Sequence, residues 1–108
     1  MNNTTTARGL FVLMEAIAKN NAVDAESSRQ MVEILKRQKF NDRIPAGLPS
    51  GTSVAHKTGD ITKINHDAAI VYAPRPFILV VLTRGIADQK ASSALIAEIT
   101  RLLYQSIQ

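Results

Sequence analysis

The stretch SVAHKTGDITKINHDAAIVYAPRPFILVVLT, residues 53–83, decides the fold of this chain. Within it, three segments rich in β-branched and apolar residues predict strands. They are Ser53 to Thr58, Asp67 to Ala73 and Phe77 to Thr83. Their connections are short, the second being Pro74-Arg75-Pro76. Short connections predict an antiparallel meander.

The third predicted strand is a run of consecutive apolar residues from Phe77 to Leu82. A strand with one face in solvent would alternate apolar and polar residues. We therefore expect both faces to be covered, as in a central strand between helical layers.

Two helices are expected before the strands. The first runs from Thr6 to Asn20, and the threonines at positions 4 to 6 can cap its start. The second begins after Asp24, a suitable cap, and ends near Gln38. The expected apolar faces are Leu10, Leu13, Met14 and Ile17 on the first helix and Met31, Ile34 and Leu35 on the second.

A loop and a last helix complete the pattern. Residues 41–52 contain prolines and glycines without a periodic apolar face, which predicts a surface loop. Asp88 can cap a final helix that runs through Gln105. The residues expected to face inward on it are Ala91, Leu95, Ile99, Leu102 and Leu103. Two helices, a three-stranded antiparallel meander and a C-terminal helix define an α+β class, with residues 1–108 as a single unit.

Composition excludes several functions. The 108 residues include no cysteine, which excludes disulfides, thiol catalysis and thiolate metal sites. The longest apolar run is too short to span a bilayer, so we expect no membrane partner. The formal charge is +4, but the densest basic stretch, Lys36-Arg37-Gln38-Lys39, ends a predicted helix and complements its dipole. Nucleic acid is therefore not the expected partner. His56 and His66 lack ligand spacing, so neither a metal nor another cofactor is expected.

The strongest motif is the strand Val54-Ala55-His56 that ends in Lys57-Thr58-Gly59. Taken alone, the triplet is also compatible with a strand that simply ends at a glycine turn. Its surroundings are more specific: Thr4-Thr5-Thr6 before a helix, Leu48-Pro49-Ser50-Gly51 before the triplet, and Leu82-Thr83-Arg84-Gly85 at the end of a later strand.

With these motifs in this order, the chain resembles the C-terminal portion of class A β-lactamases, within the penicillin-recognising serine hydrolases, along nearly its whole length. The resemblance implies catalytic roles for Lys57 and for the backbone N–H of Asp60, one of two donors to an oxyanion. It implies substrate binding by Thr58 and Gly59. Where many members carry an arginine on the next strand, this chain has His66-Asp67. Others supply that arginine from the upstream loop, which points to Arg43, and we expect Arg43 and Lys57 to share the substrate carboxylate.

The resemblance also defines what is missing. None of the seven serines is followed three residues later by lysine, so the family's Ser-x-x-Lys nucleophile lies outside this chain, as do Ser-Asp-Asn and the deacylating glutamate. We expect the isolated chain to hydrolyse no β-lactam. The apolar strand from Phe77 to Leu82 should keep an unpaired edge that favours homo-oligomers.

Three functions therefore stay open. The first is the substrate-anchoring half of a β-lactamase or D,D-peptidase-like site, with a β-lactam or peptidoglycan-like small molecule as partner. The second is a non-catalytic domain that binds peptidoglycan or partner peptides through the same groove, and the third is a basic nucleic-acid-binding module. The resemblance places the parent protein in the periplasm or outside the cell, although the first six residues carry no secretion signal.

Overall fold

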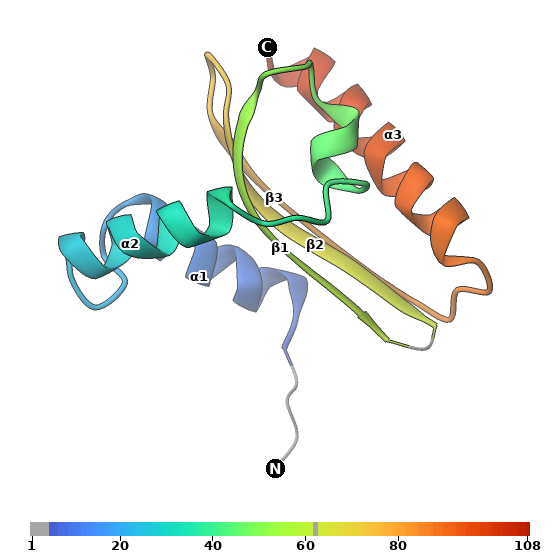
Figure 1. Ribbon diagram of the computed structural model, residues 1–108, viewed down its shortest axis with the longest axis horizontal. Helices are drawn as coiled ribbons and strands as arrows, with labels where there is room; N and C mark the ends of the chain where they lie inside the picture. Colours follow the sequence, from blue (N-terminus) through green and yellow to red (C-terminus); the bar gives the residue numbers. More distant parts are fainter. Residues whose placement is uncertain (1–4, 62) are drawn as a thin grey trace.

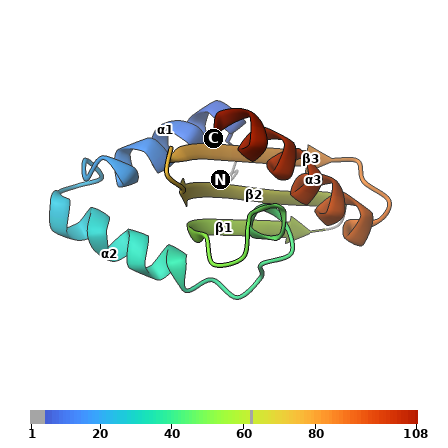
Figure 2. The same cartoon turned by 90° about the horizontal axis from the view of Figure 1, so that it is seen from above.

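A three-stranded sheet lies between two helical layers (Figures 1 and 2). A computed structural model of the chain describes residues 5–61 and 63–108. The elements in chain order are α1 (Ala7–Ala18), α2 (Ala25–Lys36), the 3₁₀ turn η1 (Ile44–Gly47), β1 (Ser53–Ile61), β2 (Ile64–Tyr72), β3 (Phe77–Arg84) and α3 (Gln89–Ile107). The predicted α+β order is confirmed. The helices α1 and α2 cover one face of the sheet, and α3 with η1 covers the other.

The strands form an antiparallel meander in the order β1-β2-β3. Its register pairs Thr58 with Asp67 and Asp60 with Asn65. The prediction that both faces of the third strand are covered is confirmed: Ile78 and Val80 pack under one helical layer, and Phe77, Leu79 and Val81 under the other. Within the described residues β3 is nevertheless an edge strand, because β2 lies between β1 and β3. An edge strand covered on both faces needs no alternation.

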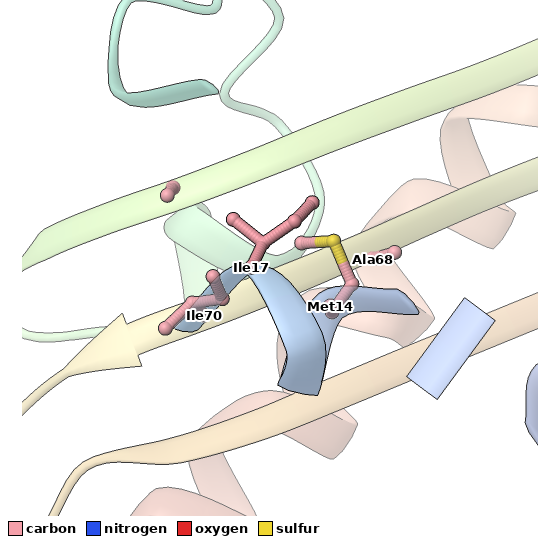
Figure 3. Close-up of a cluster of buried hydrophobic side chains, with 5 residues drawn as sticks. Met14, Ile17, Ala68 and Ile70 are labelled. Carbon is pink, nitrogen blue, oxygen red and sulfur yellow. The ribbon is translucent and has the colours of Figure 1, made fainter. Parts of the chain in front are cut away.

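The first core lies between α1, α2 and the sheet. Figure 3 shows Met14 and Ile17 of α1 directed at Ala68 and Ile70 of β2. Met31 and Leu35 of α2 pack against this cluster, whereas Leu13 and Ile34, which were also expected on the apolar faces, are largely exposed.

Both of these helices begin at the predicted caps. The Thr6 hydroxyl accepts a hydrogen bond from the Gly9 N–H at 3.0 Å, and the Asp24 carboxylate accepts one from the Ser27 N–H at 2.7 Å. Thr4, another of the expected capping threonines, lies outside the described residues.

The second core lies between α3, η1 and the opposite face of the sheet, and it corrects the predicted orientation of α3. The buried residues of this helix are Ser92, Ser93, Ile96 and Thr100, and those expected to face inward, Ala91, Leu95, Ile99, Leu102 and Leu103, are exposed. Close approach explains the small inner residues. A Cβ atom added at Gly47 of η1 would lie 2.0 Å from the backbone oxygen of Ala97, so η1 contacts the backbone of α3 directly. The Asn65 amide of β2 also donates to the Ser93 hydroxyl at 3.0 Å.

The segment predicted as a surface loop is partly internal. Ile44 is fully buried in the second core, and Arg43 immediately before it is also buried. This segment therefore forms part of the fold and fixes the backbone beside β1.

Candidate functional site

The Lys57-Thr58-Gly59 triplet lies on β1, which forms one edge of the described sheet. Alternation along the strand places Lys57 on the same face as Ala55, toward α1 and α2, and Thr58 on the face of α3. Lys57 is exposed and its Nζ donates to the backbone oxygen of Thr58. Gly59 faces open space, because a Cβ atom added there would have no heavy atom within 4 Å.

Asp60 follows the triplet and forms an ion pair with Arg43. The distance from Arg43 Nη2 to Asp60 Oδ2 is 2.9 Å. The Arg43 side chain is only 5% exposed, whereas that of Asp60 is 54% exposed. The Arg43 Nε is buried without a hydrogen-bond partner, and its nearest carboxylate oxygen, Oδ1 of Asp42, is 3.9 Å away. Arg43 therefore lies beneath Asp60 and has one strong polar partner among the described residues.

A polar cluster, buried at His56 and Asp67 and exposed at Asn41, holds the segment that carries Arg43. His56 Nδ1 lies 3.1 Å from Asp67 Oδ1, and His56 Nε2 lies 3.0 Å from Asn41 Oδ1. The other oxygen of Asp67 accepts a hydrogen bond from the Ile44 N–H at 3.0 Å. His56 and Asp67 are both buried. Residues 41 and 44 are thus fastened to β1 and β2 on either side of Arg43, which limits where its guanidinium can lie.

An apolar pocket of about 290 Å³ lies on the other face of β1, where Lys57, Thr58 and Gly59 form part of its lining. Leu10, Leu13 and Leu35 of the first helical layer contribute to its wall. This arrangement places a cation and an open backbone edge beside an apolar hollow, which suits a ligand with one anionic and one apolar part.

The structure therefore brings together some of the sequence-predicted residues and separates others. Asp60 and Arg43 are in contact, while Lys57 and Asp60 alternate onto opposite faces of β1, so Lys57 and Arg43 approach the strand from different sides. The cluster of Asn41, His56 and Asp67 was not predicted. The sequence does carry a signal for this cluster. His56 and Asp67 lie on strands with buried apolar residues, and a polar side chain buried there requires a hydrogen-bond partner.

The remaining histidine has a local structural role. Nδ1 of His66 accepts a hydrogen bond from the Thr83 N–H at 3.1 Å, which links β2 to β3. Within residues 5–61 and 63–108, no group of three His, Asp or Glu side chains is arranged to hold a metal ion.

Comparison with known sequences agrees with this architecture. A model of the β-lactamase enzyme family (Beta-lactamase2) matches residues 1–107. A β-lactamase of Bacillus licheniformis is 34% identical over 110 residues, which cover 97% of this chain and 36% of the relative. β-Lactamase 3 of Bacillus cereus is 26% identical, over 99% of this chain and 35% of the relative.

Solved structures show the same likeness. A mutant of PBP-A, determined as an acyl-enzyme complex with penicillin G, has a TM-score of 0.89 and 32% identity and covers 97% of this chain and 40% of that one. A mutant of the class A β-lactamase of the last common ancestor of Gram-negative bacteria has a TM-score of 0.85 and 30% identity, over 97% of this chain and 42% of that one.

The fold is that of the C-terminal part of class A β-lactamases. The chain belongs to the β-lactamase enzyme family. It spans about a third of the length of the curated relatives that it matches. In the part of the chain that the structure describes, no helix is both long and apolar enough to cross a membrane.

Proposed function

We propose that the edge of β1 is the substrate-anchoring half of a serine β-lactamase-like site. Its ligand is a β-lactam or a peptidoglycan-like acyl donor, which lies antiparallel to residues 57–60. Lys57 and Thr58 bind the ligand carboxylate, and Gly59 leaves room for close approach of the ligand backbone. Because β1 is an edge strand, a ligand along it can meet Lys57 from one face and Arg43 from the other.

The observation that carries this proposal is the open space at Gly59 next to an exposed Lys57. The backbone geometry supports it too. The Thr58 carbonyl oxygen accepts a hydrogen bond from the Lys57 ammonium, which places that carbonyl on the open side of β1. Backbone groups of alternate residues in an antiparallel strand point to the same side. The Asp60 N–H then points away from β2, where it can donate to an oxyanion.

Binding by the chain itself tests the proposal. Penicillin G is titrated into the ¹⁵N-labelled chain, and shifts are expected in the amide signals of residues 57–60. Lys57→Ala should abolish them, whereas Lys63→Ala, which removes an equal charge from an exposed turn, should not. Shifts that are absent, or that survive Lys57→Ala, contradict the proposal.

Catalysis is expected only when the missing serine is supplied. The pure chain should not turn over nitrocefin, and a turnover lost on Lys57→Ala would show that it has a nucleophile of its own. A longer parent protein with Ser-x-x-Lys should form a covalent acyl adduct with penicillin G. If such a parent forms no acyl adduct, the alternative function is favoured, in which the chain is a non-catalytic domain that binds peptidoglycan or peptides.

The proposal extends to the setting of the parent protein. By family resemblance it works in the periplasm or outside the cell. The chain alone should form homo-oligomers through the outer edge of β3, since within the described residues this strand is paired only with β2.

A further inference from the structure

Asp60 places a negative charge where the proposed ligand would bring its own. Its backbone N–H is the proposed oxyanion donor, and its side chain forms the ion pair with Arg43 at 2.9 Å. Because Arg43 is buried and Asp60 is half exposed, the carboxylate of Asp60 lies between the guanidinium and solvent. A ligand that approaches along β1 meets Asp60 before it meets Arg43.

The guanidinium is not fully satisfied by this pair. A guanidinium can bind a carboxylate through two parallel hydrogen bonds, but one contact of hydrogen-bond length, from Nη2, joins Arg43 to Asp60. Asp60 is half exposed on an edge strand, whereas Arg43 is held by its burial and by the hydrogen-bonded residues on either side. Asp60 is therefore the partner that a ligand can displace.

We propose that Asp60 is a specificity-determining residue that competes with the ligand carboxylate for Arg43. A ligand anion gains Arg43 only if it displaces Asp60 from the ion pair, so Lys57 provides its first anchor. The site then favours acyl donors whose group facing Arg43 is neutral, such as an ester or carboxamide, over those that present a carboxylate there. This inference rests on the proposed function, because it requires a ligand along the edge of β1.

The test compares a carboxylate probe with its uncharged methyl ester. Penicillin G and its methyl ester are titrated into the ¹⁵N-labelled chain and into Asp60→Asn. Asp60→Asn frees Arg43 for the ligand carboxylate and should tighten penicillin G binding by about tenfold. Binding of the ester should stay within about twofold, because the ester has no carboxylate for Arg43 to bind.

Two further variants assign the gain to Arg43. In the double variant Arg43→Ala with Asp60→Asn, the gain for penicillin G should disappear. Asp42→Asn, which neutralises an exposed carboxylate 3.9 Å from Arg43 Nε, should leave both affinities unchanged.

The outcomes separate this inference from the proposed function. Weaker or equal penicillin G binding by Asp60→Asn overturns the inference, because Asp60 would then orient Arg43 or play no part. If Lys57→Ala still abolishes binding in that case, the anchoring role of β1 stands. If neither probe binds the wild-type chain or Asp60→Asn, both proposals fail.

Discussion

Asp67 and His56 form a buried pair across β1 and β2, with 3.1 Å between Oδ1 and Nδ1. Through its second oxygen, Asp67 also holds the Ile44 N–H. One carboxylate therefore joins the sheet to the segment that carries Arg43. The position of the candidate site depends on residues that do not touch its proposed ligand.

Asp67→Ala should destabilise the chain strongly. It leaves His56 and the Ile44 N–H without their partner in a buried setting, which costs about 3 to 5 kcal/mol of the free energy of unfolding. Urea denaturation followed by circular dichroism measures the change. Asp42→Ala removes an exposed carboxylate and should change the free energy by less than about 0.5 kcal/mol. Equal effects of the two variants would contradict the role of Asp67.

The orientation of α3 is tested by two neighbouring residues. Ile96 is 0% exposed and Leu95 is 57% exposed. Ile96→Ala should lower the free energy of unfolding by about 2 to 5 kcal/mol, because it leaves a cavity in the second core. Leu95→Ala should change it by no more than about 0.5 kcal/mol. A larger loss of stability from Leu95→Ala than from Ile96→Ala, in thermal or urea unfolding, would show that the Leu95 face of α3 packs on the core, as the sequence pattern predicted.

Gly47 in η1 and Gly59 in the candidate site should respond differently to a methyl group. Gly47→Ala forces η1 away from the Ala97 oxygen and should cost about 1 to 3 kcal/mol of stability. Gly59→Ala meets open space and should leave the unfolding midpoint almost unchanged. In the binding titration, however, Gly59→Ala should weaken penicillin G, since the methyl group occupies the proposed approach path.

Acid should weaken the start of α2. The hydrogen bond from the Ser27 backbone N–H holds the pKa of Asp24 below its ordinary value of 3.8. The capping contribution is therefore fully present above that value and is lost as the pH falls through the lower pKa of the folded chain. The carboxyl carbon of Asp24, followed by NMR, should titrate at a lower pH than a free aspartate. In Asp24→Asn this part of the pH dependence should be absent.

Self-association should increase with concentration in sedimentation experiments. The proposed contact is the outer edge of β3, so Leu95→Glu with Leu102→Glu, which places charges on the exposed face of α3, should leave the association intact. A monodisperse monomer at all concentrations contradicts the proposal. Loss of association in the double variant would show that the chains associate through α3 instead.

The strands and helix caps could be predicted because their signals are local. Thr6, Asp24 and Asp88 accept the hydrogen bonds expected of caps, and the prolines at 74 and 76 mark the connection between β2 and β3. The burial of α3 could not be predicted in this way, because an apolar stripe on a helix normally faces the core. Here η1 lies so close to the α3 backbone at Gly47 that the buried residues of the helix are two serines, a threonine and one isoleucine.

In the candidate site, too, local features could be predicted from the sequence and contacts between distant segments could not. The triplet on β1 is contiguous in sequence and could be found as a motif. The pairing of Arg43 with Asp60, and of His56 with Asn41 and Asp67, depends on the fold, which brings distant segments together. The sequence could suggest Arg43 as a ligand for a carboxylate, but the structure places a carboxylate of the chain itself beside it.

The polar cluster of Asn41, His56 and Asp67 should constrain how these positions change among homologues. His56 bonds to both Asn41 and Asp67, so a change at any one leaves a polar atom of the cluster without its partner until a second position changes. Viable descendants should therefore exchange these three positions as a set. Arg43 and Asp60 form a separate pair, and a change at the half-exposed Asp60 should alter ligand preference without involving this cluster.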